Sequence, residues 1–390
     1  MSPGPWLRAC AGGGAVATAL AVASGPLGLA HRALVAVALP PLVAVAVAAW
    51  TTHPRLRASS WSALGLFLAA TLTWWSAPLH VGLAAGAFSA AAVALVLSFR
   101  GAAAPRGTWR DYLTLTKPRI MTLLLVTGAA GMFVGAAGAP PAGDLAVMLL
   151  GLGLACGGAS ALNHVLDADI DRLMGKRTER RPVAAGRVPA SRALEFGLAL
   201  SAGSFVLLAS LSNVLTAVLA LVGNLFYVLV YTRWLKRSTP QNIVIGGAAG
   251  AVPPLVGFAA ATGNLALPAL WLFLIVFLWT PPHFWALALL IRDSYAAAKV
   301  PMLPVVRGVS ETTRQILIYT AVLVAFTLAA GWWLGPLYVG AAATLGAAFL
   351  WLAWRLRLDP SRRLAAITFH YSLAYLALLF VAAALDPVLL

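Results

Sequence analysis

The stretch from Leu265 to Ile291 reads LALPALWLFLIVFLWTPPHFWALALLI and contains no charged residue. About 20 apolar residues suffice for a helix to cross the hydrocarbon core of a bilayer, so this stretch is long enough for one span. Comparable stretches recur along the 390 residues, of which 61% are hydrophobic and 10% charged. That is too little charge to cover the surface of a soluble protein of this length. The short alternating segments typical of a transmembrane β-barrel do not appear. The sequence therefore predicts an all-α, polytopic membrane protein.

The charge of the connections between spans predicts how the chain is oriented. Nine spans are expected after Leu115, at about 120–138, 144–165, 193–212, 214–231, 243–261, 266–290, 316–334, 337–354 and 366–385. Connections rich in Lys and Arg alternate with connections that have neither. Because basic loops stay in the cytoplasm, we expect a multi-pass protein of the cell membrane with its basic loops cytoplasmic and its C-terminus outside. The same rule accounts for the net charge of +16 without nucleic-acid binding.

The first hundred residues contain another group of apolar segments, at about 10–25, 32–50, 60–76 and 80–99. They predict an N-terminal membrane domain of about four extra spans over residues 1–100. A linker of mostly Gly, Ala and Pro over residues 101–110 separates it from the nine-span domain at 111–390. Four extra spans keep the predicted orientation consistent.

An acidic motif lies at the end of the second of the nine spans. Asn163, Asp167 and Asp171 recur every four residues, so on a helix they drift by only about 40° per step along one face. Carboxylates near the end of a membrane helix are costly unless they line a hydrated cavity or bind a cation. Two carboxylates and an amide oxygen suit Mg²⁺. The alternatives are a solvated helix end and a proton or ion relay.

Basic residues flank this acidic motif on the same predicted side. Lys176–Pro182 follows the motif directly and Tyr231–Arg237 follows a later span. Guanidinium groups match phosphate oxygens, so arginine and a metal ion together would stabilise a departing pyrophosphate. Positive-inside topology alone is the alternative explanation. Asp293, on the same side, is a candidate second acidic site.

These residues resemble the UbiA superfamily of intramembrane prenyltransferases, whose first acidic motif is N-x-x-x-D-x-x-x-D. The finer similarity is to its haem O synthase branch, the protohaem IX farnesyltransferases. It covers about residues 108–388 and includes the expected nine spans. The matching segments are Thr116–Arg119, Asp167–Asp171, Arg177–Pro182, Tyr231–Thr232, Lys236–Gly247, Trp279–Trp285 and Val300–Pro304. The branch commonly has an acid directly before the tyrosine where this chain has Ser294, so Asp293 is the only carboxylate in that motif.

The resemblance implies transfer of the farnesyl group of farnesyl diphosphate to a vinyl group of haem B, with addition of water, giving haem O and pyrophosphate. It implies Mg²⁺ held by Asp167 and Asp171, with Asn163 supporting and Asp293 serving a second ion. The residues expected to contact substrates are Lys117, Arg119, Arg177, Arg181, Tyr231, Lys236, Arg237, His283 and Tyr295. For His283 a structural role bridging helix ends is the alternative to contact with haem.

Two histidines begin spans of the N-terminal group. His31 and His80 are expected on different helices of a bundle at the same depth in the membrane. From there the two side chains would ligate one haem from opposite faces. Their surroundings resemble one half of haem A synthase, which implies a bound haem in these spans and haem A synthase as a partner. Interfacial histidines without a ligand are the alternative. For the whole chain, the competing functions are prenylation of an aromatic quinone precursor and non-enzymatic haem transport.

Overall fold

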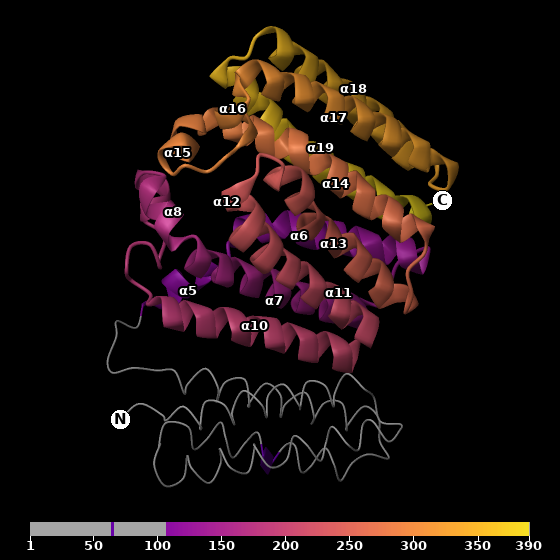
Figure 1. The fold of residues 1–390 in the computed structure, drawn as a ribbon. Helices are drawn as coiled ribbons and strands as arrows, with labels where there is room; N and C mark the ends of the chain where they lie inside the picture. Colours follow the sequence, from indigo (N-terminus) through magenta and orange to yellow (C-terminus); the bar gives the residue numbers. More distant parts are fainter. Residues whose placement is uncertain (1–63, 66–106, 390) are drawn as a thin grey trace.

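The computed structural model describes residues 64–65 and 107–389 (Figure 1). The four expected N-terminal spans, with His31 and His80, lie outside the described residues, as do the side chains of Lys176 and Arg177. Within the described part every regular element is helical. The first short helix, α5 (Trp109–Leu115), starts inside the predicted linker. Thr108 caps it, because its side chain accepts from Asp111 N while the Asp111 carboxylate accepts from Thr108 N.

In this part of the chain, nine helices are long and apolar enough to cross a membrane, as expected. They are α6 (Pro118–Ala136), α7 (Ala142–Leu166), α10 (Ala190–Leu211), α11 (Val214–Leu225) with its continuation to Ser238, α13 (Asn242–Thr262), α14 (Leu267–Leu290), α17 (Gly308–Ala329), α18 (Pro336–Leu358) and α19 (Arg362–Leu389). All but two of the predicted span ends agree with these bounds to within about five residues, close to the accuracy that apolar length allows.

The first of the two wrong span ends is the start of α17. This helix begins at Gly308, eight residues before the predicted start at 316. Its first turns are polar, and their side chains bond within the helix. Thr312 Oγ1 donates to Gly308 O at 2.8 Å and Gln315 Nε2 to Glu311 Oε1 at 2.7 Å. The helix therefore extends beyond the apolar stretch that predicted it.

The second wrong end is that of the fourth span, which was expected to stop at 231. After Leu225 the helix widens into a π-helix, η2 (Phe226–Leu235), and continues through α12 (Lys236–Ser238). Thr232 Oγ1 donates to Tyr227 O, five residues back, at 2.9 Å. π-Helical turns are rare and often occur at functional sites. Here the wider helix carries Thr232 and leads directly into Lys236 of α12.

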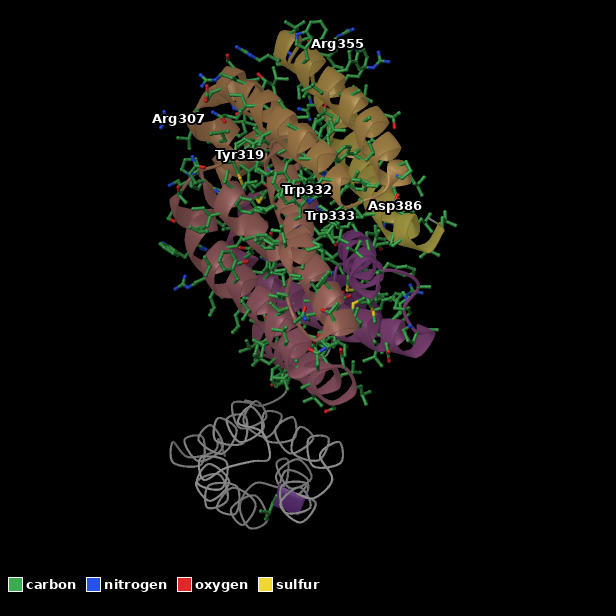
Figure 2. The ribbon with its side chains drawn as sticks, turned by 90° about the vertical axis from the view of Figure 1, so that its right-hand side faces the viewer. Arg307, Tyr319, Trp332, Trp333, Arg355 and Asp386 are labelled. Atoms are coloured by element: carbon green, nitrogen blue, oxygen red, sulfur yellow. The ribbon has the colours of Figure 1, made fainter. Side chains whose placement is uncertain are left out.

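The short helices gather at one end of the bundle (Figure 1). They are α5, α8 (Ala168–Leu173), α9 (Lys176–Glu179), α12, α15 (Arg292–Ala297) and α16 (Leu303–Val306). Figure 2 shows Arg307 and Arg355 towards one end of α17 and α18 and Trp332, Trp333 and Asp386 towards the other. The described basic connections thus share the end that carries the short helices, in agreement with their predicted alternation.

The helices of the bundle contact one another closely at Gly257 and through Asp386. A Cβ atom at Gly257 of α13 would overlap the main-chain oxygen of Gly128 on α6. Small residues permit such close contact between membrane helices. At the end away from the short helices, the buried Asp386 of α19 accepts from the main-chain N–H groups of Gly335 and Tyr338 at the start of α18. This carboxylate caps a neighbouring helix.

Candidate active site

The acidic motif forms the buried end of α7. Asn163, Asp167 and Asp171 are 2%, 0% and 1% exposed. The helix is interrupted at Asp167 (φ −94°, ψ 3°), and α8 begins at the next residue. Main-chain bonds from Asp167 N to Asn163 O (2.9 Å) and from Asp171 N to Asp167 O (2.8 Å) cross the break. The four-residue spacing is therefore kept, as expected for one helix face.

Three cations from separate segments contact this motif. Lys117 Nζ donates to Asn163 Oδ1 at 2.7 Å, and Lys236 Nζ lies 2.5 Å from Asp167 Oδ2. Arg181 Nη1 lies 2.6 Å from Asp171 Oδ1. The loop before α6, the start of α12 and the loop after α9 thus converge on the acidic motif. We call these six residues the polar cluster. It unites six of the residues predicted from sequence.

Amide and hydroxyl groups fix the geometry of the polar cluster. Asn163 Nδ2 donates to Asp167 Oδ2 at 2.7 Å and to Thr232 Oγ1 at 3.1 Å. Because Thr232 gives its own hydrogen to Tyr227 O, its oxygen is left to accept from Asn163. Since Lys117 already bonds to Asn163 Oδ1, this side chain serves here to position Lys117 and Asp167. Sequence reasoning missed Thr232, because its place depends on the π-helix.

Lys117 has an unusual backbone conformation. It lies directly before Pro118 with φ 49° and ψ 59°, in the left-handed region that non-glycine residues seldom adopt. Such conformations cost of order 1–3 kcal/mol and concentrate at functional sites. The strained turn aims the ammonium group at Asn163.

Charge in the polar cluster is unbalanced towards the positive. Three cations surround two carboxylates. Burial, and next the charges of Arg181 and Lys236, lower the pKa of Lys117 to about 7. Burial raises the pKa of Asp171, although Arg181 opposes this shift. A buried site with excess positive charge is suited to bind an anion.

Each aspartate of the polar cluster keeps one oxygen without a partner. Asp167 Oδ1 and Asp171 Oδ2 are fully buried and accept no hydrogen bond from the described residues. Buried polar atoms are nearly always paired, so these two oxygens indicate a missing ligand. They fit Mg²⁺, which prefers hard oxygens and keeps positions for water and phosphate. Over residues 107–389 no group of three or more His, Cys, Asp or Glu side chains is placed to hold a metal, so protein carboxylates would supply only part of its shell.

Arg237 lies outside the polar cluster, and its contact with the diphosphate stays a prediction. Its two terminal nitrogens each lie 2.7 Å from an oxygen of Asp169, and Nη2 also donates to Leu166 O at 2.6 Å. Hydrogen bonds from Arg237 lower the pKa of Asp169 to about 2. The guanidinium is therefore already engaged with a carboxylate of α8 and with the last carbonyl of α7. It links α12 to the junction between α7 and α8.

Of the second acidic motif, Asp293 lies at the surface and Tyr295 lies in the core. Asp293 of α15 is exposed and has no hydrogen bond or ion pair among the described residues, so its place in a second metal site stays a prediction. Tyr295 is 8% exposed and packs with Ile170 and Ile243. Burial raises its pKa to about 12. Arg119 is exposed at the start of α6.

The remaining predicted contacts are aromatic or lie outside the described side chains. Tyr231 is half-buried and packs against Tyr227, with ring centroids 5.4 Å apart and the rings tilted by 30°. A Cβ atom on Gly246 would overlap the Tyr231 ring. His283 is 6% exposed and bonds to Ser372 of α19. The side chain of Arg177 is not described, and its role stays a prediction.

His164 is a further buried residue to which the sequence assigned no role. It is 1% exposed, and neither ring nitrogen has a partner among the described residues. Viewed down the helix axis, the direction of residue 164 differs by about 60° from that of Asp167 and by about 40° from that of Ser160. The hydroxyl of Ser160 bonds to the end of α5. The imidazole thus lies at the border between the polar cluster and α5. An ionisable residue within a span is by itself a signal of function.

Comparison with known proteins identifies the family. Residues 124–380 match the UbiA prenyltransferase family. The chain is 52% identical over 281 residues to the protoheme IX farnesyltransferase of Symbiobacterium thermophilum, an alignment that covers 71% of this chain and 94% of the relative. It is 49% identical over 296 residues to that of Azotobacter vinelandii, with 75% and 98% covered. With that of Roseiflexus sp. (strain RS-1) it shares 44% over 405 residues, covering 93% and 76%. This third alignment therefore extends into the N-terminal region.

Solved structures share the fold. One chain, reported with work on digeranylgeranylglyceryl phosphate synthase, superposes with a TM-score of 0.60 at 17% identity, covering 72% of this chain and 99% of that chain. A UbiA homologue from Archaeoglobus fulgidus bound to DMAPP and Mg²⁺ gives 0.51 at 17%, with 68% and 99% covered. At these identities the likeness concerns the fold alone. The family match and the curated relatives go further: this chain belongs to the UbiA prenyltransferase family and, within it, to the protoheme IX farnesyltransferases.

Proposed function

We propose that this chain transfers the farnesyl group of farnesyl diphosphate to a vinyl group of haem B, with addition of water, to give haem O and pyrophosphate. The observation that carries the proposal is the polar cluster, in which two buried carboxylates each keep one free oxygen beside three cations. The names of the curated relatives support haem as the acceptor. The DMAPP and Mg²⁺ bound to the A. fulgidus homologue support a prenyl diphosphate and a metal ion as ligands of this fold.

The free oxygens of Asp167 and Asp171 would hold Mg²⁺. When bound, this ion supplies positive charge to the leaving diphosphate. Lys117, Arg181 and Lys236 are placed to donate to the remaining phosphate oxygens, because they already surround the two carboxylates. Asn163 keeps Lys117 and Asp167 in place during this exchange of partners.

In the proposed reaction the bond between C1 of the farnesyl group and the diphosphate oxygen breaks, and the electron pair leaves with pyrophosphate. The allylic cation takes up the electrons of a haem vinyl double bond, which forms the new carbon–carbon bond. Water adds to the resulting cation and loses a proton, which leaves the hydroxyl group. Donors fixed in advance around the leaving group lower the barrier of the first step. The burial of Asn163, Asp167, Asp171 and Lys236 helps to keep water from the cation until the carbon–carbon bond has formed.

We further propose a cytoplasmic position for the polar cluster, because it lies at the end that carries the basic connections. This places the C-terminus outside the cell membrane. The residues 1–100 are proposed as a separate four-span domain in which His31 and His80 bind a haem, with 101–110 as its linker and haem A synthase as its partner. The arginine content of the linker and the resemblance of the two histidine segments support this part of the proposal.

The acceptor is tested with membranes that contain the full chain, incubated with farnesyl diphosphate, Mg²⁺ and either haem B or 4-hydroxybenzoate. Chromatography and mass spectrometry of the products separate the functions. Formation of haem O in the incubation with haem B, without prenylation of 4-hydroxybenzoate in the other, supports the proposal. Prenylated 4-hydroxybenzoate without haem O would assign a quinone-precursor prenyltransferase instead. Haem that crosses the vesicle membrane without any product would assign a transporter.

A further inference from the structure

The imidazole of His283 is held in one tautomer by Ser372. His283 Nδ1 and Ser372 Oγ are 2.7 Å apart across the contact between α14 and α19. Ser372 Oγ also donates to Phe369 O at 2.7 Å. A hydroxyl group has one hydrogen, so the serine oxygen has to accept at its other contact. Nδ1 therefore carries the proton, and Nε2 keeps a free lone pair.

Aromatic rings fix the orientation of this imidazole. Its centroid lies 4.3 Å from that of Trp279 and 4.8 Å from that of Phe369, with interplanar angles of 16° and 23°. Trp279 Nε1 donates to Ser372 O at 2.7 Å, so Ser372 is bonded through both its side chain and its main chain. Rotation of the imidazole would break the stacking and the Nδ1 bond together.

His283 Nε2 has no partner among the described residues, yet it differs from the nitrogens of His164. Both nitrogens of His164 are fully buried without a partner, whereas His283 Nε2 is not among the buried unpaired atoms. The 6% exposure of His283 thus includes this nitrogen. No acidic side chain among the described residues bonds to the imidazole. The result is a neutral, rigidly held nitrogen donor with a small exposed area.

A neutral imidazole whose other nitrogen donates to an oxygen is the usual form of a metal-ligating histidine. Haem iron in proteins commonly takes this ligand. His283 lies seven residues before the end of α14, roughly 10 Å into the bundle from the end that carries the polar cluster.

We infer that His283 Nε2 is the axial ligand of the iron of the substrate haem and that Ser372 is a positioning residue that fixes its tautomer. The inference rests on haem being the acceptor proposed above. Ligation orients the porphyrin before the farnesyl cation forms. His370 offers a matched comparison, because its Nδ1 also bonds to an oxygen, Ala366 O at 2.8 Å, but its ring is exposed.

The test uses the full chain in nanodiscs with haem B and without farnesyl diphosphate. All variants carry His31→Ala and His80→Ala, so that haem in the N-terminal spans does not contribute. Resonance Raman spectra of the ferrous complex are expected to show an iron–histidine stretch in the parent. His283→Ala abolishes it, added imidazole restores the axial ligand, and His370→Ala leaves the band unchanged. Ser372→Ala weakens haem binding by roughly 10- to 100-fold, the usual effect of losing such a partner, and Ser372→Thr retains binding.

The outcomes distinguish a failure of the haem-ligation inference from a failure of the proposed function. A parent complex without an iron–histidine band overturns the inference even if no variant folds, and so does a band that is lost in His370→Ala but kept in His283→Ala. If the parent makes haem O and the band persists in His283→Ala, the proposed function stands and the inference fails. If the band depends on His283 but no haem O forms, haem ligation is supported and the proposed transfer fails.

Discussion

Lys236 Nζ lies 2.5 Å from Asp167 Oδ2, and the two side chains are 10% and 1% exposed. Removing both charges from water is costly, and their attraction offsets that cost only where further hydrogen bonds satisfy the remaining atoms. Here the second oxygen of Asp167 has no partner in the part of the chain that the structure describes. The buried pair is thus incompletely satisfied, in agreement with a site that needs a ligand.

Replacing Lys236 is expected to damage both stability and activity. Lys236→Met leaves Asp167 as a buried charge without a cation, so the free energy of unfolding falls by about 3–5 kcal/mol. Haem O formation falls as well, because a diphosphate contact is lost. Thermal unfolding in detergent and a product assay measure the two effects. Arg233→Met removes an exposed cation of the π-helix that precedes Lys236; it is the control and should retain both. Wild-type stability in Lys236→Met would contradict the burial of this pair.

Arg237 is expected to act as a structural link instead of a diphosphate contact. Its carboxylate partner, Asp169, has a side chain that is 63% exposed, and exposed pairs contribute only about 0.2–1 kcal/mol. Arg237→Ala and Asp169→Asn should therefore each destabilise the protein slightly, with non-additive effects in the double variant. KM for farnesyl diphosphate should stay within about twofold of the wild type, since the effect on binding is indirect. A much larger rise in KM for Arg237→Ala alone would restore the sequence-based prediction.

The lowered pKa of Lys117 predicts how diphosphate binding depends on pH. Burial lowers its pKa to about 7, so the free protein loses this positive charge as pH rises through that value. The kcat/KM for farnesyl diphosphate is then expected to fall above about pH 7. The stability has the opposite trend: between pH 7 and the ordinary lysine pKa of 10.5 the unfolded state binds more protons, so rising pH favours folding through this group. Lys117→Arg, which stays protonated, should flatten the decrease in kcat/KM. A decrease unchanged in that variant would assign it to another group.

His164 is expected to show a trade-off between stability and activity. Because its ring nitrogens are buried without partners, His164→Leu should stabilise the chain by about 1–3 kcal/mol. Activity should fall, because the change removes both polar atoms that this side chain presents beside the polar cluster. His164→Asn keeps a donor and an acceptor and should retain more activity than His164→Leu. Denaturation and kinetic measurements on the two variants check this. Lower stability together with normal turnover in His164→Leu would show a packing role only.

Apolar length and charge alternation made the spans predictable from sequence, because both signals are local. The same holds for Asn163, Asp167 and Asp171, whose spacing places them on one face even across the break at Asp167. The partner of Arg237 was not predictable, since it depends on how two remote helix ends meet.

Other misses have separate physical causes. Thr232 enters the site through a π-helix, and no residue pattern in Phe226–Leu235 indicated that winding. The bond between His283 and Ser372 joins residues 89 positions apart. Contacts of this kind arise from packing, on which a single sequence gives little information.

The assignment of the two free carboxylate oxygens as Mg²⁺ ligands is tested most directly by the Mg²⁺ dependence of haem O formation. The assay compares wild type, Asp167→Asn, Asp171→Asn and Asp144→Asn. Asp144 is an exposed acid at the opposite end of the same helix and serves as the matched control. Mg²⁺-dependent turnover is expected in the wild type and in Asp144→Asn, with a loss of about 100-fold or more in the other two variants at equal amounts of protein in the membrane. Wild-type turnover and Mg²⁺ dependence in either Asp167→Asn or Asp171→Asn would contradict the assignment of the polar cluster as the metal–diphosphate site.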